Sequence, residues 1–119
     1  MYKQDYILRL IEDLSKIIAK IFFDKTISQY ESFYEKNNTQ TDELYIKLNS
    51  LLALGNINEA ENLLFEEMDT SNKEYLKIAL DFYNKVNDFD DDYLEKNNYT
   101  REEIEEGLKA ISKRFGIVL

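Results

Sequence analysis

Residues 44–68 read LYIKLNSLLALGNINEAENLLFEEM, and this stretch decides the fold. Leucines recur three and four positions apart on either side of a single glycine, Gly55, which is typical of two amphipathic helices joined by a turn. Glycine is the residue best able to adopt the left-handed conformation that ends a helix. Asn58, followed three residues later by Glu61, offers a capping pattern for the second helix. Because the connection is only about three residues long, we predict an antiparallel helical hairpin.

Helical spacing continues on both sides of this hairpin. The apolar residues from Lys3 to about Glu35 predict one long N-terminal helix, either continuous or with a kink or break near Asp24 to Thr26. Two capping boxes, Ser71 to Glu74 and Thr100 to Glu103, predict where two further helices begin. The sequence therefore predicts an all-α protein of about five helices, with the long N-terminal helix packed beside helical hairpins.

The composition agrees with a single helical domain over residues 1–119. Proline is absent and only three glycines occur, so the residues that form tight turns and β-hairpins are scarce. With 44% hydrophobic residues, a chain of 119 residues can sustain one core. No apolar stretch approaches the roughly 20 residues needed to cross a bilayer. We therefore expect a cytoplasmic protein that does not bind a membrane.

The charge and the residue types that are missing exclude several classes of function. The formal net charge is −9, and most of the acidic excess lies in residues 61–119. A field of this sign repels phosphate backbones, so we expect no nucleic-acid partner. The chain has no histidine and no cysteine, and we expect no metal and no cofactor. Since phosphate-binding glycine loops and nucleophile elbows are also missing, the sequence does not predict an enzyme.

One acidic stretch has the spacing of a calcium-binding loop. Asp88, Asp90 and Asp92 occupy the first, third and fifth positions of such a loop. The sixth position is Tyr93, where the loop needs glycine, and the twelfth is Tyr99, where it needs a bidentate glutamate. We interpret the stretch as a solvated, helix-capping connection with a short turn near Tyr93 against the core.

The hairpin resembles one tetratricopeptide repeat. Gly55, Ile57 and Ala60 match that motif's glycine turn, the apolar residue two positions on and the alanine five positions on. Leu48 departs from the motif, which has a small residue there. The resemblance covers one unit, residues 44–68, so it implies a helical hairpin and not a repeat array.

If the hairpin binds as such repeats do, part of its first helix faces a protein partner. The partner-facing residues that this resemblance implies are Asp42, Tyr45, Asn49 and Leu52. The lysine and arginine residues with which some of these repeats hold a terminal carboxylate are lacking at these positions. We therefore predict a protein–protein interaction module or small accessory subunit, with a protein partner.

The beginning of the chain is similar to another group of proteins. Gln4-Asp5-Tyr6-Ile7, with Arg9 and Ile11-Glu12, resembles a family of short, functionally uncharacterised helical proteins of low-GC Gram-positive bacteria. The resemblance implies a helical fold and a bacterial cytoplasm, and it implies no reaction.

The N-terminal segment has more apolar surface than one side of a helix in a small domain requires. A four-three rhythm typical of a helix seam is kept by Ile7, Ile11, Leu14, Ile18 and Ile21. We expect these residues to form a homodimer interface. The alternative is a kinked helix whose two edges are both covered within the chain. Two alternative functions follow: a structural homo-oligomer built on this helix, and an acidic inhibitor that mimics nucleic acid.

Overall fold

The computed structural model describes residues 2–23 and 41–117, and all the regular secondary structure in these residues is helical. The helices are α1 (Tyr2–Phe23), α2 (Thr41–Ala53), α3 (Ile57–Glu67), α4 (Lys73–Asp88), α5 (Asp91–Lys96) and α6 (Arg101–Arg114). The predicted all-α fold is confirmed. One helix more than the five expected is present, because the acidic connection contains α5.

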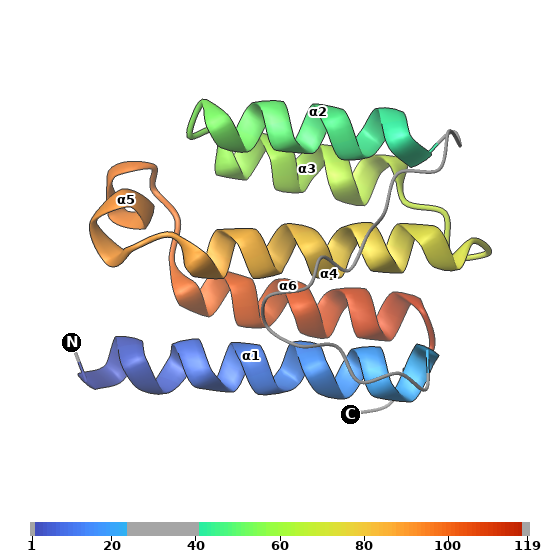
Figure 1. Ribbon diagram of the computed structural model, residues 1–119, viewed down its shortest axis with the longest axis horizontal. Helices are drawn as coiled ribbons and strands as arrows, with labels where there is room; N and C mark the ends of the chain where they lie inside the picture. The colour runs from blue at the N-terminus through green and yellow to red at the C-terminus, as the bar shows by residue number, and fades with distance from the viewer. Residues whose placement is uncertain (1, 24–40, 118–119) are drawn as a thin grey trace.

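Helix α4 lies in the middle of the structure (Figure 1). It packs against α2 on one side and against α1 and α6 on the other, while α3 packs on α2. This position explains why nine of the 16 residues of α4 are buried, including two polar ones, although the helix is amphipathic. Its buried residues are Leu76, Ile78, Ala79, Leu80, Asp81, Phe82, Tyr83, Val86 and Asn87.

Helices α2 and α3 lie side by side and form the predicted hairpin (Figure 1). Gly55 adopts φ +82° in the turn between them, a backbone conformation that side-chain-bearing residues rarely adopt. The N-cap of α3 is Asn56, and its side chain makes no capping hydrogen bond. The predicted cap at Asn58 is therefore wrong. Its amide donates instead to the Asn98 carbonyl oxygen, 3.1 Å away, and so joins the start of α3 to the chain after α5.

Of the two predicted capping boxes, the one at the start of α6 is present and the one at the start of α4 is not. Thr100 and Glu103 form the predicted capping box at the start of α6. The box expected from Ser71 is wrong, because Asn72 is the N-cap of α4 and accepts from the Glu74 backbone N–H at 3.0 Å. Ser71 donates instead to the Asp69 carboxylate, from both its backbone N–H and its hydroxyl.

The acidic connection after α4 is a capping segment, as interpreted. Asp90 is the N-cap of α5, and its carboxylate accepts from the Tyr93 backbone N–H at 2.8 Å. Leu94 is buried and holds this short helix against the core. In residues 2–23 and 41–117, no group of three or more acidic side chains is arranged to hold a metal ion.

Helix α1 uses one face to pack on α6 and α4. On this face Ile7, Ile11 and Ile18 are only 9%, 1% and 0% exposed, so they belong to the core of the chain itself. Their assignment to a dimer interface is therefore corrected: they are not on the surface that a second copy would meet. Leu14 packs half-buried beside the core, whereas Ile21 is 55% exposed. The oligomeric state itself stays a prediction.

The other edge of α1 is apolar as well. Tyr6, Leu10, Ile17 and Ile21 are exposed along it. Even so, none of the helices in the described part of the chain is both long enough and apolar enough to cross a bilayer. The break that the sequence predicts near Asp24 to Thr26, and the extension of the helix to Glu35, lie outside the described residues.

Candidate functional site

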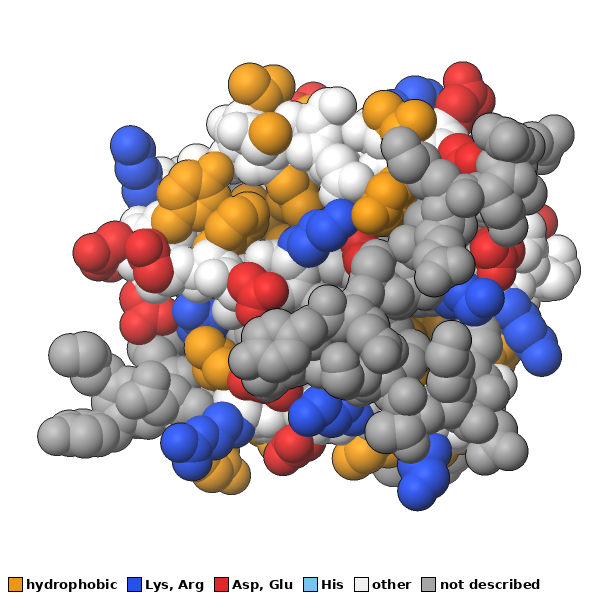
Figure 2. Space-filling model, in the orientation of Figure 1, with side chains coloured by type: hydrophobic (Ala, Val, Ile, Leu, Met, Phe, Trp, Pro, Cys, Tyr) orange, Lys and Arg blue, Asp and Glu red, His pale blue; other side chains and the backbone are white. Residues whose placement is uncertain are grey.

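An open groove of about 500 Å³ lies between α2, the C-terminal end of α4 and the start of α5. It is lined by Asn49, Leu52, Ala53, Lys85, Asp88, Phe89 and Tyr93. Figure 2 shows hydrophobic side chains gathered on this face between α2 and α4, beside α5, where they meet solvent. The volume lies in the range of roughly 300–1,000 Å³ that is usual for sites that bind small groups.

Helical spacing places the α2 residues of the groove on one face. Leu52 and Ala53 follow Asn49 by three and four positions, so both lie next to Asn49 on one face of α2. Opposite them, Phe89 ends α4 and Tyr93 lies in α5, with their ring centroids 4.6 Å apart. The groove therefore has an apolar floor with aromatic rings on one wall.

Lys85 joins α4 to α2 at one end of the groove. Its ammonium group lies 2.8 Å from the Asp81 carboxylate and donates to Asn49 Oδ1 at 2.8 Å and to the Tyr45 hydroxyl at 3.0 Å. Burial acts to lower the pKa of Lys85, but the hydrogen bonds to Asp81 and Tyr45 and the charge of Asp81 outweigh it, and the pKa is raised. An ammonium group has three N–H donors, so these three partners use all of them. Lys85 is therefore a cross-link whose charge is balanced by Asp81.

Asp88 is the second charged residue of the groove, and its situation is different. It forms neither a hydrogen bond nor an ion pair through its side chain with any other residue that the structure describes. Burial raises the pKa of Asp88, and the positive charge of Arg101 acts in the opposite direction. The groove thus carries one exposed carboxylate that has no partner among the described side chains.

Arg101 fixes the wall of the groove from behind. It is 3% exposed, and its Nε and Nη2 atoms lie 3.0 Å from Asp91 Oδ1. Its Nη1 atom donates to the backbone and side-chain oxygens of Asn87, both at 2.8 Å, and Nη2 also donates to the Phe89 carbonyl at 2.7 Å. Asn87 in turn donates to the Leu8 carbonyl in α1 at 3.3 Å. Arg101 therefore ties α6 to the junction of α4 and α5, where the aromatic wall begins.

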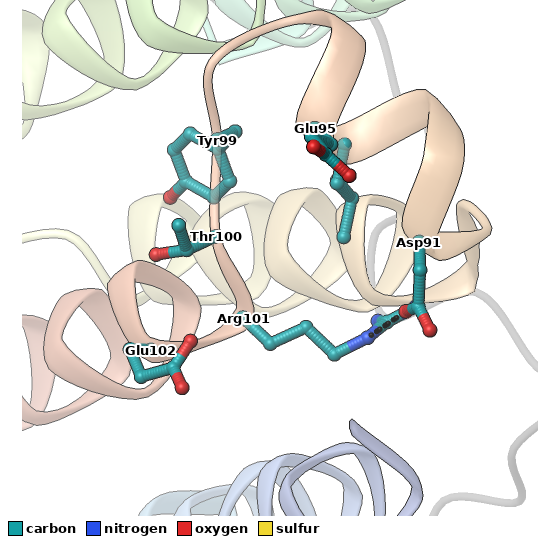
Figure 3. Close-up of a pocket in the computed structure, with 7 residues that line it drawn as sticks. Asp91, Glu95, Tyr99, Thr100, Arg101 and Glu102 are labelled. Carbon is teal, nitrogen blue, oxygen red and sulfur yellow. Dashed lines mark hydrogen bonds and ion pairs between the residues drawn. The ribbon is translucent and has the colours of Figure 1, made fainter. Parts of the chain in front are cut away.

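A second cavity, of about 310 Å³, lies between α5 and the start of α6. Figure 3 shows Arg101 crossing its base to Asp91, with Glu95, Thr100 and Glu102 around it. Arg101 donates four hydrogen bonds to protein oxygens, and its Nη2 atom also forms an ion pair with Asp91, so its guanidinium group is already engaged within the protein. We assign the cavity's arginine a structural role.

A buried carboxylate–tyrosine cluster joins α3 to α4 and to the segment before α6. Glu61 Oε2 accepts hydrogen bonds from the hydroxyls of Tyr83, at 2.5 Å, and Tyr99, at 2.8 Å. Burial raises the pKa of Glu61; the tyrosine hydrogen bonds oppose this shift, and the charges of Glu103 and Glu106 add to it. Burial and the neighbouring Glu61 also raise the pKa of both phenols. The cluster makes Glu61 a source of pH-dependent stability.

We expect the wild-type protein to gain stability relative to Glu61→Gln as the pH is lowered from 7 towards about 4.5, the ordinary value for this carboxyl. Because the pKa of Glu61 is higher in the folded state, the folded protein binds this proton more tightly than the unfolded chain does. Its contribution to the free energy of unfolding therefore falls as the pH rises through that window. Glutamine keeps a carbonyl oxygen for the two tyrosines but does not titrate.

Urea unfolding of both proteins at pH 7, 6 and 5 measures this difference. Glu59→Gln, at an exposed position of α3, controls for the loss of one negative charge. A difference between wild type and Glu61→Gln that stays constant over this range would contradict the prediction.

The structure brings together two of the four predicted partner-binding residues. Asn49 and Leu52 line the groove, although Leu52 is only 5% exposed and lies in its floor. Tyr45 lies one turn away and binds Lys85 instead of lining the groove. Asp42 lies a further turn away and is not part of the lining.

Sequence reasoning missed the other side of the groove, which consists of Lys85, Asp88, Phe89 and Tyr93. The sequence does contain a pattern that indicates this side of the groove. Two aromatic residues four positions apart stand within a run of aspartates, where apolar side chains are unexpected unless they pack against something.

The comparisons with known proteins give one match. The model of a family of unknown function (DUF6483) matches residues 1–116. Neither the curated proteins nor the solved structures include a match to this chain.

Proposed function

We propose that this chain, which belongs to the family of unknown function DUF6483, is a protein-interaction module that binds a segment of a partner protein in the groove between α2, α4 and α5. The observation that carries the proposal is the groove itself: an apolar floor, open to solvent, with polar groups at its rim. Protein interfaces combine a hydrophobic centre with a polar rim in the same way.

The floor supplies the favourable free energy of binding. Phe89 and Tyr93, both half-buried, present apolar surface above the nearly buried Leu52, and fully burying one large side chain against such surface is worth about 1.5–3 kcal/mol. Tyrosine and phenylalanine are enriched where proteins meet, because their large rings lose little conformational entropy on binding. One anchoring side chain of a partner is therefore the natural occupant of the groove.

The rim supplies orientation. The Oδ1 atom of Asn49 accepts a hydrogen bond from Lys85, and the Nδ2 group of the same amide can donate a hydrogen bond to a partner. At the opposite edge, the Asp88 carboxylate can accept. The resemblance of residues 44–68 to a tetratricopeptide hairpin supports the same face of α2 as the binding face.

Peptide display tests this proposal. A library of random dodecapeptides on phage is selected on the folded protein, and the affinity of the selected peptides is measured for three chains: wild type, Ala53→Arg and Ser50→Arg. Both substitutions add the same side chain at an exposed position of α2, but only Ala53 lines the groove. We expect Ala53→Arg to weaken binding by at least about tenfold and Ser50→Arg to leave it unchanged.

Two results would refute the groove as the site. One is a selection that yields no binding peptide, and the other is a set of peptides that bind Ala53→Arg as tightly as wild type. Circular dichroism of the two variants shows whether each keeps the helical fold.

A further inference from the structure

We infer that the partner segment carries a lysine or arginine close to its apolar anchor, and that Asp88 receives this basic side chain. The inference rests on the proposed function, because it names the chemistry of the partner that the same groove would bind. It follows from how charge is distributed among the residues that line the groove.

The two charged residues of the groove are not equivalent. Lys85 is balanced by the Asp81 carboxylate at 2.8 Å, and its other donors are bound to Asn49 and Tyr45. It has no donor left for an acidic partner. Asp88 has no such partner among the described side chains, and it is an exposed member of the groove lining. A cation placed beside it gains an attraction that no nearby group already satisfies.

The surroundings of Asp88 strengthen this preference. The positive charge of Arg101 acts to lower the pKa of Asp88, but the hydrogen bonds of Arg101 go to Asp91, Asn87 and Phe89 and none goes to Asp88. The next acidic residues, Asp90, Asp91 and Asp92, follow within four positions, and the chain as a whole carries a net charge of −9. A field of this sign attracts basic segments to the groove and repels acidic ones.

The shape of the groove fits a long basic side chain better than a compact cation. The Phe89 and Tyr93 rings line the same groove as Asp88, and the methylene stem of a lysine or arginine can pack on such rings while its charged end reaches a carboxylate. A metal ion would need several acidic ligands together, and the described residues contain no cluster of that kind. A peptide segment with an apolar side chain and a neighbouring basic residue can therefore pack on the floor of the groove and pair with Asp88 at the same time.

A defined peptide library tests the inference. Dodecapeptides with a fixed central phenylalanine carry lysine, glutamine or glutamate at one of the four positions on either side, and their affinities are measured by fluorescence polarisation. We expect the best lysine peptide to bind the wild type at least about tenfold more tightly than its glutamate counterpart. Asp88→Asn, which keeps the shape of the side chain, should abolish this preference, and raising the salt concentration should reduce it.

Asp92→Asn is the matched control, because it removes an exposed carboxylate from the same acidic segment outside the groove lining. A lysine preference that survives in Asp88→Asn, or that is lost equally in Asp92→Asn, would overturn the inference. The groove would still be upheld as the binding site if Ala53→Arg weakens peptide binding. If no library peptide is sensitive to Ala53→Arg, the proposed function fails, and the inference fails with it.

Discussion

Replacing Arg101 by leucine is expected to lower the free energy of unfolding by about 3–5 kcal/mol, the usual effect of removing one partner from a buried charged network. The guanidinium group is 3% exposed and serves the carbonyls of Asn87 and Phe89 together with the Asp91 carboxylate. Leucine would leave the Asn87 and Phe89 carbonyls without these donors, and would also remove the partner of the Asp91 carboxylate, which is 47% exposed. Each group left unpaired costs free energy in the folded state. Urea unfolding followed by circular dichroism at 222 nm measures the loss.

Arg114→Leu provides the matched control for Arg101→Leu. Arg114 is exposed, and it donates to the Phe65 carbonyl at 3.1 Å while lying over the ring of the same residue. An exposed interaction of this kind contributes at most about 1 kcal/mol. Equal losses in the two variants would show that Arg101 is not the centre of a buried network.

Gly107→Ala is expected to lower the free energy of unfolding by about 2–3 kcal/mol, although the same change in an open helix would raise it by about 1 kcal/mol. Gly107 lies in the middle of α6, and a Cβ atom added there would overlap the hydroxyl and ring of Tyr83. Tyr83 cannot move away easily, because it is buried and its hydroxyl is bound to Glu61. The glycine is therefore required by the tyrosine that packs on it.

A double-mutant cycle tests this reason for the effect of Gly107→Ala. In a Tyr83→Leu background the ring and hydroxyl are gone, so adding the methyl group at position 107 should cost much less than it does in wild type. The measurement is thermal and urea unfolding of the two single variants and the double variant. Purely additive effects would mean that Gly107 is required for some other reason.

The features of the fold that could be predicted from the sequence depend on neighbouring residues. The glycine turn at Gly55 and the capping box from Thr100 to Glu103 are decided within a few positions, and the structure confirms both. The predicted cap of α3 at Asn58 was wrong: the N-cap is Asn56, and two asparagines two positions apart offer the same local signal. Packing against the chain after α5 decides between them, since Asn58 binds the Asn98 carbonyl.

The features that could not be predicted depend on contacts between distant residues. Helix α5 has only six residues, and an isolated helix of that length is unstable in water. It forms because Leu94 is buried and Arg101 binds Asp91. The candidate site shows the same division: spacing along α2 identified Asn49 and Leu52, whereas the opposite wall with Asp88 comes from another part of the chain.

The packing of α1 against α4 and α6 closes most of the chain into a loop. Leu8 and Asn87, 79 positions apart, are joined by a hydrogen bond, and the Phe22 and Phe115 rings meet edge to face with centroids 5.6 Å apart. The entropy lost on closing a loop grows with its length, so contacts across the short turn of a helical hairpin cost less entropy than contacts between α1 and α6. We expect the α2–α3 hairpin and α4 to assemble first and α1 to dock late. In native-state hydrogen exchange, the amides of α1 should then exchange through a partial opening in which α2, α3 and α4 stay folded.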